Sequence, residues 1–234
     1  MNSVRFVGET PLLKQVQQAT IEECVEYCSS KKILGVDTET EGFDFTCKKM
    51  IMLQIGDRER QYVIDTRTVD VSPLKEILES HEITKVLHNA KFDYKFIKMW
   101  AGISLEEIYD TFLVERVINC GKQDYGYSLA RCTERYLGKT LDKETRNRFI
   151  GLKGQPYTVD QITYGANDVV YLLDIREKQL VLLHTYELEQ VARLENKVVK
   201  VFSEIEYEGL MIDKDKWTAM AEDNVKLAFE QELK

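Results

Sequence analysis

The sequence lacks the patterns that mark several large classes of protein. It has no apolar run near the length of about 20 residues that a helix needs to cross a bilayer. The residues after Met1 do not form the apolar region of a secretory signal peptide. It also has no G-x-G-x-x-G pattern and no Walker phosphate loop, so nothing in it supports a nucleotide-cofactor enzyme. We therefore expect a soluble, cytoplasmic protein with no membrane partner.

Cysteine is scarce, and positive charge is outweighed by negative charge. The five cysteines are an odd number, and no cluster of cysteine and histidine completes a zinc site, so we expect buried or partly buried thiols. The formal net charge of −8 disfavours a protein that coats nucleic acid through a broad basic surface. It does not exclude a nuclease, because bound metal cations change the charge of the site itself.

The sequence does contain enough apolar residues for a folded core. Hydrophobic residues make up 44% of its 234 residues, which predicts one sizeable domain or one domain with an appendage. Strand patterns occupy 33–38, 50–55, 61–64 and 85–88. Helical patterns occupy 21–30, 72–80, 90–100, 110–118, 128–136, 158–178, 186–208 and 214 onward. This order predicts an α/β fold with a mixed sheet flanked by helices.

The helix predicted over 158–178 brings two polar side chains together. Tyr164 and Asp168 are four residues apart, so they lie on one face of the helix. Thr158 and Gln161 predict a capping box at its start. The locally basic stretch 139–154 precedes this helix, and it is either a solvated loop or a loop that touches substrate phosphates.

Three more carboxylates occur where they can reach the same point. Asp37 and Glu39 alternate along a strand and so point to one face, while Asp93 lies in the first turn of the helix that Asn89 is expected to cap. Neighbouring acids repel each other unless a cation lies between them, and oxygen ligands suit Mg²⁺ or Mn²⁺. Each pattern alone also fits a turn or a surface pair. Together they predict two divalent metal ions at a phosphodiester, with Tyr164 orienting a water.

The stretches VDTET, HNAKFD and YGAND resemble, in this order, the three motifs of the DEDD superfamily of 3′–5′ exonucleases. Tyr164 is typical of the subgroup whose third motif is Tyr-x-x-x-Asp. The resemblance runs from about Ile33 to Leu183 and includes SLARCTERYLG and DVVYLLDI. It implies a ribonuclease H-like mixed sheet flanked by helices, here with a C-terminal helical extension. It also implies a phosphodiester hydrolase.

The resemblance assigns a role to each motif residue. It implies that two Mg²⁺ or Mn²⁺ ions are held by Asp37, Glu39, Asp93 and Asp168, and that Tyr164 is catalytic with them. The residues expected to bind substrate are Thr38, Phe43, His88, Asn89 and Phe92. Among these, Asn89 matches a family asparagine that contacts the terminal nucleotides. Phe43 is either a wedge against the terminal bases or an ordinary loop residue.

Two residues depart from the usual family pattern. Phe92 stands where many relatives have tyrosine, and we expect little effect from this change. Gly165 stands where alanine is commoner, at an expected cost of about 1 kcal/mol in helix propensity. No expected metal ligand is missing, which disfavours an inactive relative.

The segment 193–217 resembles the connection between the exonuclease and polymerase domains of family A DNA polymerases, although an amphipathic helix pair also fits it. We therefore expect an exonuclease domain at 1–185, and a helical linker at 186–234 that begins a truncated polymerase domain of the same native chain. The expected substrate is a single-stranded DNA 3′ end, cut by a monomer in a bacterium or a phage-infected cell. Two alternatives stay open: a ribonuclease D-like enzyme that trims RNA 3′ ends, and a module that binds 3′ ends without cutting.

Overall fold

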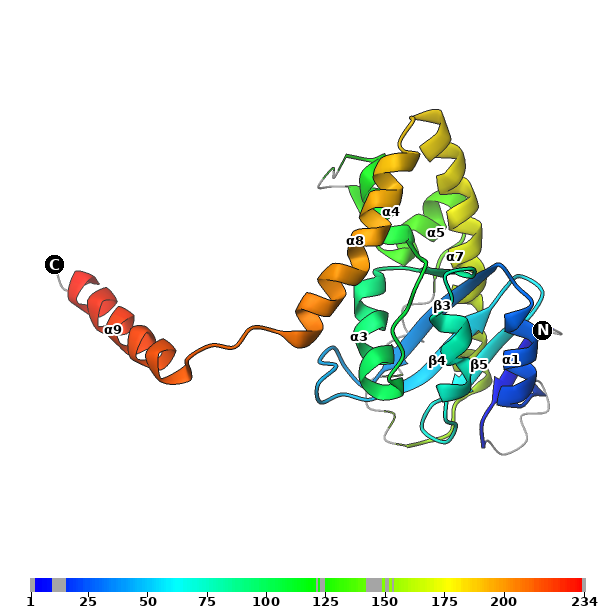
Figure 1. Ribbon diagram of the computed structural model, residues 1–234, viewed down its shortest axis with the longest axis horizontal. Coiled ribbons are helices and arrows are strands. Elements are labelled where there is room, and N and C mark those ends of the chain that lie inside the picture. The colour runs from blue at the N-terminus through cyan, green and yellow to red at the C-terminus, as the bar shows by residue number, and fades with distance from the viewer. Residues whose placement is uncertain are drawn as a thin grey trace. The chain divides into compact units, whose positions relative to one another are not determined.

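The computed structural model describes residues 3–9, 16–120, 122, 125–141, 149, 152 and 154–232. They form two compact units, Met1–Glu204 and Ile205–Lys234. The first unit is built on a seven-stranded sheet with the strand order β2-β1-β5-β4-β3-β6-β7 (Figure 1). No helix in the described part of the chain is both long enough and apolar enough to pass through a bilayer.

The sheet is mixed, as the sequence predicts. Its strands are β1 (Val4–Val7), β2 (Gln17–Gln18), β3 (Ile33–Thr40), β4 (Met50–Gly56), β5 (Gln61–Asp65), β6 (Thr84–Leu87) and β7 (Ile108–Asp110). The β3–β4 and β4–β5 pairs are antiparallel, and the other pairs are parallel. Strands β1, β2 and β7 were not predicted, because they are short and have no clear alternation.

The helices agree with the predicted set, with shifted ends. They are α1 (Ile21–Ser29), the 3₁₀ turn η1 (Ser72–Leu74), α2 (Lys75–Leu78), α3 (Ala90–Ala101), α4 (Thr111–Ile118), α5 (Leu129–Leu137), α7 (Val159–Thr185), α8 (Glu189–Glu208) and α9 (Lys214–Glu232). The capping box of Thr158 and Gln161 is confirmed at the start of α7. The helix predicted over 72–80 begins as a 3₁₀ turn with Val71 as its N-cap residue, and the Ser72 hydroxyl donates to Asp70.

Alternating side chains of β3 face opposite sides of the sheet. Leu34 and Val36 join the core on the α1 and α3 side of the sheet. On the other side α7 lies very close to the strand, since a Cβ on Gly35 would stand 2.7 Å from the Val169 carbonyl oxygen. A glycine in β3 therefore allows α7 to approach the strand that carries Asp37.

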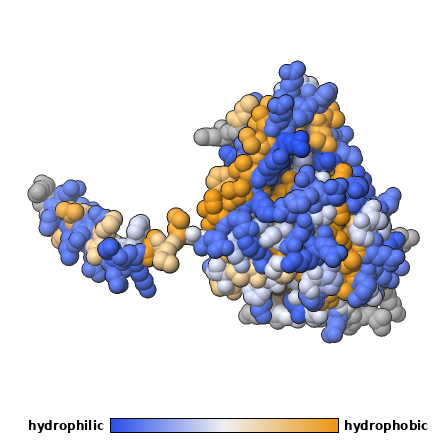
Figure 2. Space-filling model, viewed as in Figure 1, coloured by the Kyte–Doolittle hydropathy of each residue, from blue (hydrophilic) through white to orange (hydrophobic). Residues whose placement is uncertain are grey.

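Helix α8 packs against the first unit through its buried residues Ala192, Val199 and Ser203. Apolar side chains remain exposed along its other side, at Val191, Leu194, Val201 and Phe202, and Figure 2 shows orange patches along this helix. In the second unit α9 is exposed along its whole length, and 210–213 forms no strand. The predicted domain boundary at 185 stays a prediction.

Candidate active site

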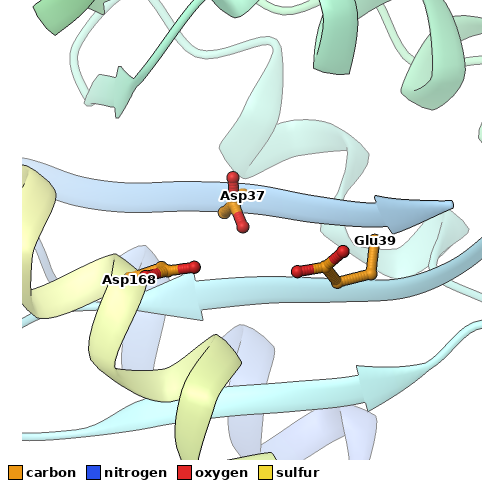
Figure 3. Close-up of side chains that lie close together, drawn as sticks. All are labelled: Asp37, Glu39 and Asp168. Carbon is orange, nitrogen blue, oxygen red and sulfur yellow. The ribbon is translucent and has the colours of Figure 1, made fainter. Parts of the chain in front are cut away.

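Three of the four predicted metal ligands lie together on the α7 side of the sheet. Asp37 and Glu39 come from β3, and Asp168 comes from α7. Each offers a carboxylate oxygen, and these oxygens lie within 4.8 Å of one another. Figure 3 shows the carboxylates of Asp168 and Glu39 directed toward each other, with Asp37 on the neighbouring part of β3. No other group of this kind occurs within the described residues.

Asp93, the fourth predicted ligand, is outside this close group but electrostatically linked to it. It lies buried in the first turn of α3. Its Oδ1 accepts a hydrogen bond of 2.6 Å from the hydroxyl of Thr38, which points to the opposite side of β3 from Asp37. Burial and then the negative charge of Asp37 raise the pKa of Asp93 well above its ordinary value. The predicted contact of Thr38 with substrate stays a prediction.

The start of α3 is held by a residue that sequence reasoning did not assign to it. The expected side-chain cap by Asn89 is wrong, because this residue has a left-handed φ of 62° and makes no such bond. Asp110, at the end of β7, accepts instead from the backbone nitrogens of Asn89 and Ala90, both at 2.9 Å. Burial raises the pKa of Asp110 despite these bonds. The exposed Asn89 side chain is thus not used to cap the helix.

His88 and Thr111 add to this junction. The His88 Nδ1 lies 2.9 Å from the Thr111 hydroxyl, which donates 2.9 Å to the carbonyl of Leu87. The His88 ring also meets Phe112 edge-on, with centroids 5.6 Å apart. The ring of His88, a predicted substrate-binding residue, is therefore held in place by the first residues of α4.

Two of the predicted substrate-binding residues, Phe43 and Phe92, are aromatic and contact each other. Phe43 follows β3 and is 78% exposed, although it is a large apolar side chain. Its ring contacts Phe92 edge-on at 6.4 Å, and Phe92 packs on Phe96 at 4.9 Å. The exposed ring of Phe43, supported by the packed ring of Phe92, is suited to stack against a nucleic-acid base.

Tyr164 lies on α7 one turn before Asp168 and is half-buried. Its ring packs near that of Phe149, with centroids 6.2 Å apart. Phe149 belongs to the basic stretch before α7. The two roles left open for that stretch, a solvated loop or a contact with substrate phosphates, concern mainly 142–148, which lie outside the described residues.

The donor set fits divalent cations. Carboxylate oxygens are the ligands that Mg²⁺ and Mn²⁺ prefer, and the cluster contains neither histidine nor cysteine. Several like charges in a small, partly buried volume repel each other, and a bound cation relieves that repulsion.

Comparison with known proteins places the chain among nucleases. A family model described as 3′–5′ exonuclease matches residues 15–183. DNA polymerase I of Aquifex aeolicus is 27% identical over 184 residues, which are 78% of this chain and 30% of that protein. Ribonuclease D of Escherichia coli is 33% identical over 150 residues, which are 63% of this chain and 38% of that protein. The chain thus spans less than half the length of these curated relatives.

Solved structures confirm the expected ribonuclease H-like fold. The crystal structure of E. coli RNase D aligns with a TM-score of 0.72 at 27% identity, covering 86% of this chain and 52% of that one. Brucella melitensis NrnC with bound Mg²⁺ aligns with a TM-score of 0.70 at 18% identity, covering 88% of this chain and 94% of that one. These TM-scores show that both share the fold of this chain.

Proposed function

Because the chain belongs to the 3′–5′ exonuclease family, we propose that it hydrolyses the phosphodiester bond at single-stranded 3′ ends and releases 5′-mononucleotides. The observation that supports this most is the acid cluster, which consists of Asp37, Glu39 and Asp168. Its carboxylate oxygens come from two distant segments and lie within 4.8 Å of one another. A fold does not gather carboxylates in a partly buried place for stability, since their repulsion opposes folding. Their grouping instead suits a cation-dependent hydrolase.

Asp37, Glu39, Asp93 and Asp168 would hold two divalent cations, Mg²⁺ or Mn²⁺. When bound, such cations stabilise negative charge on the attacking and leaving oxygens of an in-line displacement. Tyr164 would orient the attacking water through its hydroxyl. A phenol ordinarily ionises only at about pH 10, so a neutral phenol is a better hydrogen-bonding partner than a base.

The substrate end would lie between the start of α3 and the loop after β3. The exposed side chain of Asn89 and the ring of His88 would contact the terminal nucleotides, and Phe43, on Phe92, would stack on a terminal base. Stacking accepts any base, so little sequence preference is expected. The net charge of −8 favours contact with a few nucleotides near the acids over binding along an extended basic surface.

We take DNA as the leading substrate, in a cytoplasmic monomer whose native chain continues into a polymerase domain. The likeness to DNA polymerase I and the pattern of 193–217 support this choice. RNA is the second candidate, because ribonuclease D is similar to this chain in both sequence and structure. The choice depends on whether the site accepts a 2′-hydroxyl.

The test compares matched 5′-labelled single-stranded DNA and RNA in Mg²⁺ or Mn²⁺. The proteins are the wild type, Asp37→Ala and the control Glu82→Ala, whose side chain is 84% exposed in a surface pair. We expect a ladder that shortens from the 3′ end of DNA, is lost with EDTA or Asp37→Ala, and persists in Glu82→Ala. Faster cutting of RNA would select the ribonuclease D-like activity. Intact substrate in every lane would overturn the proposal in favour of a binding module.

A further inference from the structure

Gln54 is a buried polar residue beside the acid cluster that no motif includes. It lies in β4, directly opposite Asp37 of β3 in the antiparallel register. Opposite residues of such a pair point to the same face of the sheet, with Cβ atoms about 5 Å apart. The Gln54 side chain is therefore on the α7 side, next to Asp37, and none of it is exposed to solvent.

Helix α7 lies directly on this side chain. A Cβ on Gly165 would stand 2.7 Å from the Gln54 Nε2 and 2.9 Å from its Cγ. Gly165 lies between Tyr164 and Asp168, so the Gln54 amide is beneath the turn of α7 that carries both residues. The absence of a side chain at Gly165 therefore leaves space for this amide, at the expected cost in helix propensity.

The buried Gln54 amide lowers the stability of the fold. Within the described part of the chain, neither its oxygen nor its nitrogen has a hydrogen-bond partner. A buried amide without partners costs about 1–3 kcal/mol, and an apolar side chain of similar size avoids that cost. Gln179, another fully buried glutamine on α7, differs, because it donates 2.8 Å to the Thr111 carbonyl and 2.8 Å to Glu115. Stability explains Gln179 but does not explain Gln54.

We propose that Gln54 is a positioning residue for the metal ligands. Its amide nitrogen donates a hydrogen bond to the Asp37 carboxylate and fixes its orientation when that carboxylate holds a divalent cation. This inference rests on the proposed metal site and adds a residue that touches neither substrate nor the reacting atoms. Such outer contacts typically change metal affinity by roughly 10–100-fold.

The experiment measures metal binding without substrate. Metal-free wild type, Gln54→Leu and the matched control Gln179→Leu are titrated with Mn²⁺ by calorimetry, and their thermal unfolding is followed in EDTA. For Gln54→Leu we expect Mn²⁺ affinity to fall roughly 10–100-fold, while Tm in EDTA stays equal or rises. For Gln179→Leu we expect the reverse, with unchanged Mn²⁺ affinity and a lower Tm.

Three outcomes would count against the inference in different ways. Equal Mn²⁺ affinity in wild type and Gln54→Leu overturns the role of Gln54 and leaves the proposed function intact. No Mn²⁺ binding by the wild type overturns the inference together with the proposed metal site. A lower Tm for Gln54→Leu with unchanged affinity assigns Gln54 to packing alone. If the leucine variant does not fold, Gln54→Met, which keeps the unbranched shape, takes its place.

Discussion

Glu115 and Asp93 are both buried carboxylates of the first unit, yet the side chains around them differ in charge. Glu115, in α4, accepts from Arg135 at 2.6 Å, from the Tyr136 hydroxyl at 2.7 Å and from Gln179 at 2.8 Å. Asn119 adds a fourth donor at 3.1 Å. These donors come from α5, from α7 and from the residue that follows α4, so the carboxylate joins three helices with its charge compensated.

The surroundings of Asp93 are different in kind. A neutral hydroxyl, that of Thr38, donates to it, and the charges that shift its pKa are those of Asp37 and Asp110. Burial and these like charges raise the pKa, so the fold makes ionisation of Asp93 unfavourable. The comparison teaches that the fold places a cation beside Glu115, which joins three helices, and places further carboxylates around Asp93, where an external cation is expected.

Asp93→Asn is the change with the largest expected effect. It removes a proposed ligand, so we expect cleavage of single-stranded DNA to fall by about 10³-fold or more, because several kcal/mol of charge stabilisation are lost. The Tm in EDTA should stay equal or rise, because an amide cannot carry the negative charge that burial and Asp37 disfavour at this position. Cleavage rates and thermal unfolding in EDTA check both parts. A lower Tm in EDTA would make Asp93 structural and would break the comparison.

Arg135→Leu tests the other side of the comparison. It leaves Glu115 buried without its cation, so we expect the free energy of unfolding to fall by about 3 kcal/mol or more. The cleavage rate per folded molecule should not change. Urea unfolding measures the loss, and Arg131→Leu is the control, because its 2.9 Å pair with Glu134 is exposed and worth about 1 kcal/mol at most. Equal effects of the two variants would contradict the structural role of Glu115.

Added Mg²⁺ should sharpen the contrast between the two groups. At about 100 times its Kd, a ligand of the folded state stabilises it by about 2.7 kcal/mol. We expect Tm to rise by the amount that corresponds to this free energy in the wild type, and Arg135→Leu to gain the same stabilisation, since Arg135 pairs with Glu115 and is not a proposed metal ligand. Asp37→Asn should lose most of it, and EDTA should reverse it. A full rise in Asp37→Asn would place the binding ion elsewhere.

Much of the candidate site was predictable because its patterns are local. Asp37 and Glu39 share a face through strand alternation, and Tyr164 and Asp168 share one through helical spacing. The capping box at Thr158 is likewise set by residues three positions apart. Local backbone geometry fixes such relations before any tertiary packing is known.

The parts that escaped prediction depend on contacts between distant residues. The bonds from Asp110 to the start of α3 cross 20 and 21 positions, so an ordinary expectation placed the cap on Asn89. Strand β7 has three residues, too few for alternation to be recognised. The packing of Gln54 against Gly165 joins a strand to a helix far along the chain, and only the fold reveals that the glycine is needed for space.

Lys85 offers the smallest test, with a third kind of buried charge. Its ammonium donates to the carbonyls of Ser80 at 2.5 Å and Ile83 at 2.6 Å, so neutral groups alone satisfy it. Burial lowers its pKa from 10.5 to about 8, although the charges of Glu107 and Glu106 act in the opposite direction. Between these values the unfolded chain binds the proton and the folded protein does not, so stability rises with pH from about 8 to 10.5. We expect the free energy of unfolding of wild type to gain about 2 kcal/mol over Lys85→Met across this range, measured by urea unfolding at both ends. If the free energy of unfolding changes with pH equally in the two proteins, neutral carbonyls stabilise a buried ammonium as well as water does. The contrast between compensated and uncompensated buried charges would then apply to carboxylates alone.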